Sequence, residues 1–405
     1  AGPVRDAFLA ALGQVWTLDK EQTLTKGTPF TFLGIEMIMQ DNGNILLHQR
    51  QFIDSLLEKY GLTRVKGNTS VQTDKFPEEA LPSPVELKKL QCHSGEFNWL
   101  ATRTRVDLSY YTSLLASALS KHKDWSLELV HKILRYLAST RDQGIVISCS
   151  GSLTDLIAWS DAGFAGTDTK SQSGLVISWG GSIITWRSSR QSVSTMSTAE
   201  AELNAAALAW QIVEGIRLLI GDFGYRPESV RILIDNKAAL TIAECGATWR
   251  TRYFAVRGHR LHEEHSTGRA ILEHCKTDVM LADALTKLAP AGVISLLHSA
   301  MHSEYSPNCP TVASARAEQV TSSASVDQTL GDKDPVFELD PWSSKSSSSK
   351  GSSPPNLLKP EKRIVKKFKL AQLWGMITYM ILRIVLPSMP SITESALVPT
   401  VYGKM

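Results

Sequence analysis

The chain has 405 residues, of which 43% are hydrophobic, and its 43 lysines and arginines nearly balance 40 acidic residues. This length and composition suit about two or three folded domains and exclude a wholly disordered protein. The small net charge means that any nucleic-acid-binding surface must be a local patch. Five dispersed cysteines without a C-x-x-C pair exclude a cysteine zinc site and a disulfide scaffold. With no secretion signal at the N-terminus, we expect an intracellular protein of the cytoplasm or nucleus.

The first segment, residues 1–150, alternates short strands with amphipathic helices. Strand-like stretches at 30–38 and 45–49 flank a turn of Asn and Gly residues, which predicts a hairpin. Apolar residues at three- and four-residue spacing predict helices. The predicted helices cover 52–60, 106–120 and 126–139. No catalytic group of residues stands out in this segment, so we interpret it as a scaffold.

The second segment, residues 151–292, has a mixed α/β rhythm with an antiparallel start. Its strand signals are followed by a long helix that begins near 198, a further strand, a basic stretch and a short final helix. The predicted strands include 156–161, 174–179, 183–186 and 230–234. The second and third of these form a predicted hairpin about Gly180 and Gly181.

The composition changes again after this segment. Residues 293–361 are rich in Ser and Pro and are predicted to form a flexible linker. Residues 362–405 contain a basic run and then an apolar stretch that includes Gln372 and Arg383. A spanning helix needs about 20 mainly apolar residues, so an interfacial or buried helix is favoured over a membrane-spanning one, and membrane contact is not the main expectation for this segment. Unrelated sequence fused downstream would also explain this last segment.

Two of four notable acidic residues follow strands. Asp161 ends an apolar strand and precedes small residues that leave room for a ligand. Asp235 ends a run typical of a central strand, and the next residue, Asn236, can cap a helix. A helix cap explains Asp235 equally well when it is considered alone.

Glu202 is the most informative of the four. It shares a helix start with Glu200, but residues two apart cannot share a face. Ser197 and Glu200 have the spacing of a capping box, which gives Glu200 a structural role. Glu202 instead falls on the apolar face with Ala206 and Val213. A glutamate on an inward face needs a partner, and a bound cation would provide one.

Asp283 is the fourth acidic residue and lies in a small-residue helical turn, where an ordinary solvated acid is an equally good explanation. Together, carboxylates from two strand ends and two helices suit Mg²⁺, which prefers oxygen ligands, with Mn²⁺ as a substitute. Two such ions roughly 4 Å apart can activate water and stabilise a leaving oxygen at a phosphodiester. Hydrolysis of a nucleic-acid backbone is the reaction class that follows.

Five motifs in order resemble those of copia-type retrotransposon Pol polyproteins, in the ribonuclease H domain and the end of the reverse transcriptase before it. W-S-D-A-G-F-A-G resembles the family's Y-S-D-A-D-W-A-G, and K-S-Q-S-G resembles K-S-T-S-G. The stretch from Ile184 to Glu202 resembles I-S-W-x-S-K-K-Q followed by S-S-A-E-A-E. D-N-K-A-A resembles D-N-Q-S-A, and L-A-D-A-L-T-K resembles L-A-D-I-F-T-K.

The resemblance implies a ribonuclease H-like mixed sheet flanked by helices, after an α+β thumb- or connection-like segment and before a disordered tail. It also implies an enzyme that cuts the RNA strand of RNA/DNA hybrids and binds its metal ions through four acidic residues. These are Asp161, Glu202, Asp235 and Asp283. The remaining reverse transcriptase, its palm and fingers, would be a partner.

The sequence also departs from the family. No Asp-Asp dipeptide of the polymerase site occurs, so polymerase activity is not expected from this chain alone. Gly163 replaces the second acid of S-D-A-D, which leaves the four proposed ligands intact. The alternative hypothesis is a catalytically lapsed remnant that still binds nucleic acid.

Candidate nucleic-acid contacts lie in two stretches. Arginines interleaved with aromatic residues follow the third acid and suit phosphate contacts and stacking, although a solvated basic helix face is the plainer explanation. These arginines are Arg250, Arg252, Arg257 and Arg260. Polar residues elsewhere offer further donors, or serve as an ordinary polar loop. These are Ser188, Arg190, Gln191 and Asn236.

Overall fold

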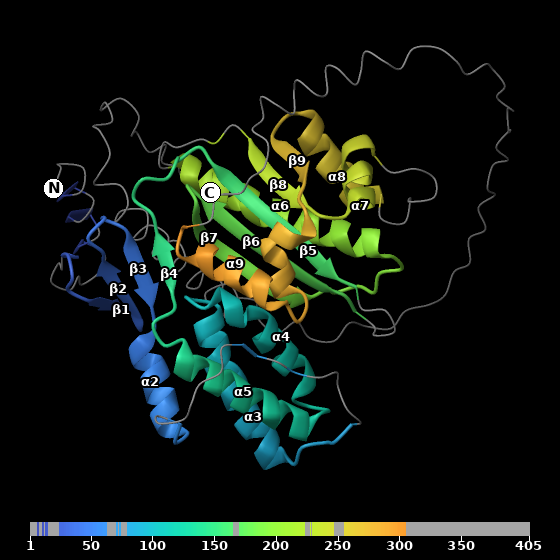
Figure 1. Ribbon diagram of the computed structural model, residues 1–405. Coiled ribbons are helices and arrows are strands. Elements are labelled where there is room, and N and C mark those ends of the chain that lie inside the picture. Colours follow the sequence, from blue (N-terminus) through green and yellow to red (C-terminus); the bar gives the residue numbers. More distant parts are fainter. Residues whose placement is uncertain are drawn as a thin grey trace, which may run out of the picture. The chain divides into compact units, whose positions relative to one another are not determined.

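The computed structural model describes residues 24–62, 79–164, 170–222, 229–246 and 255–304, with a few isolated positions outside these ranges. Figure 1 shows the course of these elements. Nearly all of the predicted linker and the whole 362–405 segment lie outside the described residues.

A four-stranded antiparallel sheet opens the described chain. Its strands are β1 (Phe30–Phe32), β2 (Ile35–Met39), β3 (Ile45–His48) and β4 (Ile145–Ile147), in that spatial order. The predicted hairpin is confirmed, because β2 and β3 pair around a turn in which Gly43 has a φ of 84°. In that turn the Asn44 amide donates to the Asn42 side chain at 3.0 Å. The fourth strand was not predicted from the sequence.

Four helices surround one apolar core beside this sheet. They are α2 (Arg50–Lys59), α3 (Pro84–Ala101), α4 (Ser109–Ala118) and α5 (Lys123–Ser139). Ile53, Phe97, Leu115 and Ile133 are fully buried in their shared core. Helix α3 was not predicted from the sequence, although Ser83 and Glu86 form a capping box at its start, with Pro84 at the first helical position.

The second sheet has five strands in the order β7-β6-β5-β8-β9. They are β5 (Leu156–Gly163), β6 (Gln172–Trp179), β7 (Ser182–Arg190), β8 (Val230–Ile234) and β9 (Ala270–His274). β5, β6 and β7 pair antiparallel, whereas β8 and β9 continue parallel to β5. This mixed order confirms the ribonuclease H-like fold class.

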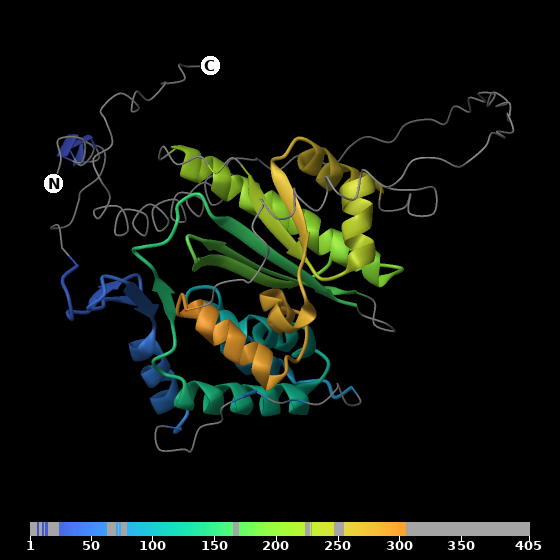
Figure 2. The same ribbon diagram turned by 45° about the horizontal axis from the view of Figure 1, so that its top comes forward.

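Helices cover both faces of the second sheet. Figure 2 shows α6 (Thr198–Asp222), α7 (Lys237–Cys245) and α8 (Ala255–Ser266) on one face, with α9 (Ala291–Met301) on the other. The short 3-10 helix η4 (Leu281–Leu285) contacts β5 and β6. Of the described helices, α6 alone has the length and apolarity of a membrane span. Its buried Leu203, Ala206 and Val213 instead mark it as a core helix.

The predicted start of the linker at 293 is wrong for its first residues. Residues 291–301 form α9, because Val293, Ile294 and Leu297 recur at helical spacing and are buried. Beyond the helix, the Ser303 hydroxyl donates to the Val146 carbonyl at 2.7 Å. The chain therefore stays folded at least to the end of the described residues at 304. The other predicted domain boundaries stay predictions.

A buried polar network joins α9 to the first segment. The Arg105 guanidinium donates to the Asp107 carboxylate at 2.7 Å, and the Tyr136 hydroxyl donates to the same carboxylate at 2.6 Å. His298 of α9 lies 3.0 Å from the Tyr136 hydroxyl. Burial opposes ionisation of Asp107, yet Arg105 and His298 hold its pKa below the usual range. Separating the two segments would remove one partner of this network and leave a buried charge unpaired, which is costly. The whole chain is therefore the suitable form for experiments.

Candidate metal-binding acidic site

Two strands deliver the first two acids to one edge of the second sheet. β5 and β8 are parallel neighbours, and Ser160 of β5 pairs with Ile234 of β8. Asp161 follows Ser160 in β5, and Asp235 follows Ile234 just past the end of β8. Both acids therefore lie at the same carboxyl-terminal edge of the sheet. Such edges collect binding residues in sheets that contain parallel strands.

Glu202 reaches the same edge from the first turns of α6. One carboxylate oxygen from each of Asp161, Glu202 and Asp235 lies within 4.8 Å of the others. The buried Glu202 Oε2 has no hydrogen-bond partner among the described residues. An unpartnered buried oxygen is costly, and the all-oxygen donor set suits a hard divalent cation. The structure thus brings together three of the four predicted acids.

Glu200 has the structural role that the sequence predicted. The Glu200 amide donates to the Ser197 hydroxyl at 3.2 Å. The Glu200 carboxylate accepts from the Met196 amide at 2.8 Å, one residue before the usual capping-box position. The choice of Glu202 over Glu200 as the inward acid agrees with its 5% exposure.

Burial and mutual repulsion raise the pKa of each of these three acids. Burial raises the pKa of Glu202 to about 9, and the charges of Asp161 and Asp235 act in the same direction. Burial also raises the pKa of Asp161 to about 7, against the bond from Thr286. The pKa of Asp235 is raised by burial and lowered in part by a bond from Thr277. A bound cation would favour the charged forms of all three.

Asp283 is not among the three acids whose oxygens converge, but its charge acts on Asp161 and Asp235. It is buried in η4, and its Oδ1 lies 2.5 Å from the Nζ of Lys287. The Lys287 side chain is 48% exposed, and its charge also acts on Asp161, Glu202 and Asp235. Lys287 therefore neutralises part of a strongly negative site.

We expect Lys287→Met to strengthen binding of Mn²⁺ to the protein in the absence of substrate. Removing a positive charge next to the acids should lower the apparent Kd by roughly tenfold. Calorimetric titration of the whole chain with Mn²⁺ measures this change. Lys170→Met is the matched control, because Lys170 lines the same cleft and is exposed. An unchanged Kd in Lys287→Met would show that Lys287 does not oppose cation binding.

Two glycines allow η4 and the residue after it to approach the sheet closely. A Cβ on Gly174 would lie 2.6 Å from Thr286 Cγ2 and 2.7 Å from the Ala282 carbonyl oxygen. A Cβ on Gly163 would lie 2.6 Å from the Thr286 carbonyl oxygen. Any side chain at 163 would displace Thr286. Thr286 in turn donates a hydrogen bond to Asp161.

A cleft of about 610 Å³ opens over the acids. Asp161, Glu202 and Asp235 line it together with Asn236 and Lys287. Part of its wall comes from α4 in the first segment, through Tyr110, Leu114 and Ser117. We name it the catalytic cleft. The α4 residues of this cleft carry no signal in the sequence that would have identified them.

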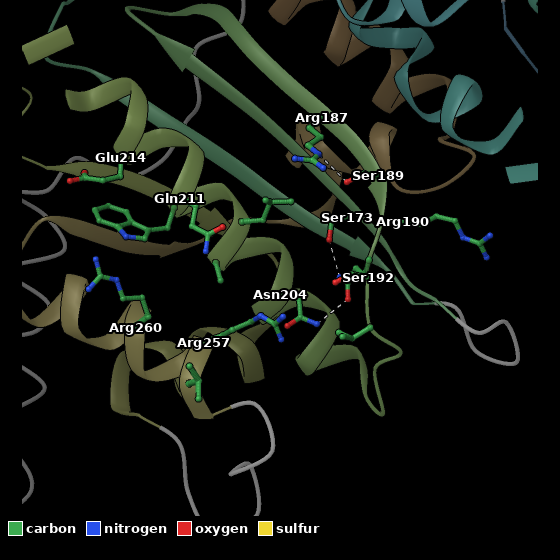
Figure 3. A pocket seen from close by; sticks show the side chains of 16 residues that line it. Ser173, Arg187, Ser189, Arg190, Ser192, Asn204, Gln211, Glu214, Arg257 and Arg260 are labelled. Atoms are coloured by element: carbon green, nitrogen blue, oxygen red, sulfur yellow. Dashed lines mark hydrogen bonds between the residues drawn. The ribbon is translucent and has the colours of Figure 1, made fainter. Parts of the chain in front are cut away.

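A second groove, of about 710 Å³, lies between β7, α6 and α8. Figure 3 shows Arg257 and Arg260 entering it from α8, and Arg187 and Ser189 from β7. Arg260 is paired with Glu264 at 2.6 Å, while Arg257 is exposed. We name this the arginine groove. Arg190 lines both the arginine groove and the catalytic cleft, and so stands where they meet.

The structure assigns internal roles to three of the predicted nucleic-acid contacts. The Ser188 hydroxyl donates to the Leu285 carbonyl at 2.6 Å, so its single proton is already used. Asn236 accepts from the Ala239 amide at 3.0 Å and caps α7, as its position predicted. Gln191 is buried and joins β7 to α6. Arg250 and Arg252 lie outside the described residues.

We expect Gln191→Leu to lower the free energy of unfolding by about 2 to 3 kcal/mol. The Gln191 amide donates to Ser173 and to the Ala201 carbonyl, both at 2.9 Å, and accepts from Asn204 at 3.0 Å. Leucine would leave these groups unsatisfied in a buried place. Urea unfolding of the whole chain gives the value. Gln211→Leu, at an exposed position of the same groove, should change it little, and equal losses in both variants would contradict this role.

Comparison with known proteins agrees with this geometry. The chain is 28% identical over 265 residues to the Pol polyprotein of transposon RE1 from Arabidopsis thaliana, covering 63% of this chain and 18% of the polyprotein. It is 25% identical over 219 residues to the Ty1-JR2 Gag-Pol polyprotein of Saccharomyces cerevisiae, covering 53% and 12%. The homologues of this chain are retrotransposon Pol polyproteins. The resemblance to the C-terminal part of copia-type Pol is thus confirmed, and the chain spans less than a fifth of these relatives' length.

Solved structures give a weaker likeness. Ribonuclease H1 from Halobacterium salinarum is 19% identical, with a TM-score of 0.26, and the match covers 33% of this chain and 94% of that one. LC11-RNase H1, solved in complex with an RNA/DNA hybrid, is 16% identical, with a TM-score of 0.27 over the same share of both chains. No family model matches the chain. The fold assignment therefore depends on the strand order of the second sheet.

Two residues that act on the site were not predicted from the sequence. Thr286 bonds Asp161, and Lys287 pairs with Asp283. Both end the L-A-D-A-L-T-K motif, so a signal was present beside the fourth acid.

Proposed function

We propose that this chain is the metal-dependent ribonuclease H of a retrotransposon Pol protein, cutting the RNA strand of RNA/DNA hybrids made during reverse transcription. One observation supports this most strongly: three carboxylates from β5, α6 and β8 converge within 4.8 Å, and one buried oxygen of Glu202 is left unpartnered. Acids gathered in this way at the edge of a mixed sheet fit a divalent cation site.

Asp161, Glu202 and Asp235 would hold Mg²⁺ or Mn²⁺, and Asp283 would complete a two-ion site. Such cations supply an activated water and stabilise the leaving oxygen of a phosphodiester. The chain's own residues prepare the site: Thr286 orients Asp161, and Lys287 limits repulsion among the carboxylates. Gly163 and Gly174 let η4 lie against the sheet so that Asp283 stays next to the other acids.

The arrangement of the two grooves fits a duplex substrate. The catalytic cleft and the arginine groove meet at Arg190, whose exposed side chain makes no ion pair or hydrogen bond to another described residue. Arg187 and Arg257 face the arginine groove and are exposed. Guanidinium groups suit phosphate oxygens, so one strand would enter the catalytic cleft while the other follows the arginines.

We also propose the rest of a reverse transcriptase as a partner of this chain. The palm and fingers of a reverse transcriptase would lie elsewhere in a longer Pol protein, and polymerase activity is not proposed for this chain alone. Action in the cytoplasm or nucleus remains a prediction, and so does the absence of membrane contact by residues 362–405.

The choice of substrate is tested by comparing duplexes. The whole chain in Mg²⁺ should cut the RNA of an RNA/DNA hybrid at least about a hundredfold faster than RNA in an RNA duplex, and should leave a DNA duplex intact. Equal rates on both RNA-containing duplexes would contradict hybrid specificity. Binding of the hybrid without any cutting would favour the alternative, a lapsed remnant.

A further inference from the structure

A third cleft, of about 620 Å³, lies beside the catalytic cleft and is walled mainly by the first segment. Two helices, α3 and α4, and the end of β7 form it. Its lining residues are Gln91, Ser94, Gly95, Asn98, Thr112, Ser113, Ala116, Ser117, Ser188, Ser189 and Arg190. We name it the α3–α4 groove.

The α3–α4 groove is continuous with the catalytic cleft. Ser117 of α4 and Arg190 of β7 line both. Tyr110 and Leu114 face the catalytic cleft, while Ser113, on the same helix, faces the α3–α4 groove. A single helix thus forms part of the wall along both, and a strand leaving the acids on this side would run along it.

Hydrogen bonds fix this wall to the second sheet. The Trp186 indole of β7 donates to the Ala101 carbonyl at the end of α3 at 2.7 Å. The Gln172 amide of β6 donates to Ser113 of α4 at 2.9 Å and to Ser188 at 2.8 Å. The groove is therefore held in place relative to the acids, as a substrate surface must be.

The side chains that line the α3–α4 groove indicate which kind of ligand it would bind. Among the described residues that line the groove, none is acidic, and Arg190 is the one charged side chain. On α3, Gln91, Ser94, Gly95 and Asn98 have the spacing of one helix face. Gln91 and Asn98 lie about 10 Å apart along the axis, or about three base steps of 3.4 Å. The hydroxyls of Thr112, Ser117 and Ser188 already donate within the protein. The side-chain amides of Gln91 and Asn98, beside Arg190, suit a phosphodiester backbone.

We propose that the α3–α4 groove binds the backbone of the cut strand to one side of the scissile phosphate. This inference rests on the proposed function and extends the hybrid-binding surface from the second sheet onto the first segment. A hybrid long enough to reach α3 would then bind more tightly than one that covers only the acids. The first segment would have a direct role in substrate binding.

The test places negative charge in the groove without changing side-chain size. Gln91 and Asn98 are both exposed, so Gln91→Glu with Asn98→Asp adds two charges and should leave the fold intact. Gln51→Glu, at an exposed position on α2, is the matched control. Binding of fluorescent hybrids of about 8 and about 24 base pairs is measured by anisotropy on the whole chain, in Ca²⁺ to prevent cutting.

For the long hybrid, we expect the double variant to raise Kd by roughly tenfold at low salt and to weaken the salt dependence of binding. The short hybrid and the Gln51→Glu control should be unaffected. An unchanged Kd for the long hybrid, or an equal loss for both lengths, would overturn the inference and leave the proposed function intact. Failure of the wild-type chain to bind either hybrid would refute both.

Discussion

Replacing Asp235 with asparagine is expected to slow cleavage of an RNA/DNA hybrid by at least about a hundredfold while leaving the protein folded. The substitution keeps the shape of the side chain and removes one of the three converging carboxylates. Since Asp235 follows β8 and is only partly buried, its loss should not disturb the core. Rates are measured with the whole chain in Mg²⁺ and in Mn²⁺ on hybrid whose RNA strand carries an end label.

Asp124→Asn is the matched control for that experiment. It makes the same chemical change at a carboxylate that is 76% exposed on α5. The cut RNA should also carry 5′-phosphate and 3′-hydroxyl ends, because a water attacks the phosphorus and the 2′-hydroxyl does not. Cleavage that survives in Asp235→Asn at the wild-type rate would show that these acids do not carry the reaction.

The second large effect concerns stability. In buffer without divalent cations, Glu202→Gln is expected to raise the free energy of unfolding at pH 8 by about 2 to 4 kcal/mol. The folded protein holds the Glu202 proton to a pKa of about 9, against an ordinary value of 4.5. Between pH 4.5 and about pH 9, the folded state therefore binds more protons than the unfolded chain. Its stability must fall as the pH rises through that range.

Urea unfolding at several pH values between about 5 and 9 tests this sign. The wild-type chain should lose stability with rising pH, and Glu202→Gln should lose much less. Added Mn²⁺ should raise the melting temperature of the wild-type chain more than that of the variant, because a bound cation stabilises the folded state alone. A variant that is less stable than wild type at pH 8 without metal would contradict the burial argument.

Much of the site could be predicted from local patterns. Asp161 and Asp235 stand at the ends of apolar strands, and strands β5 and β8 were visible as apolar runs. Glu202 was separable from Glu200 by helix periodicity alone, which the burial of Glu202 supports. These inferences succeeded because each depends on residues close together in the chain.

What could not be predicted depends on contacts between distant residues. The sequence around Gln191 suggests a polar loop residue, but in the structure Gln191 is buried where β7 meets α6. The α4 wall of the catalytic cleft arises from packing of one segment on another, through bonds such as Trp186 to Ala101. No local pattern signals such packing.

Metal-dependent cleavage of an RNA/DNA hybrid by the whole wild-type chain tests the central claim most directly. With the RNA strand end-labelled, we expect shorter RNA products in Mg²⁺ or Mn²⁺, none in EDTA, and an intact DNA strand. Full-length RNA after incubation with either metal, from a folded protein that binds the hybrid, would contradict the claim of catalysis.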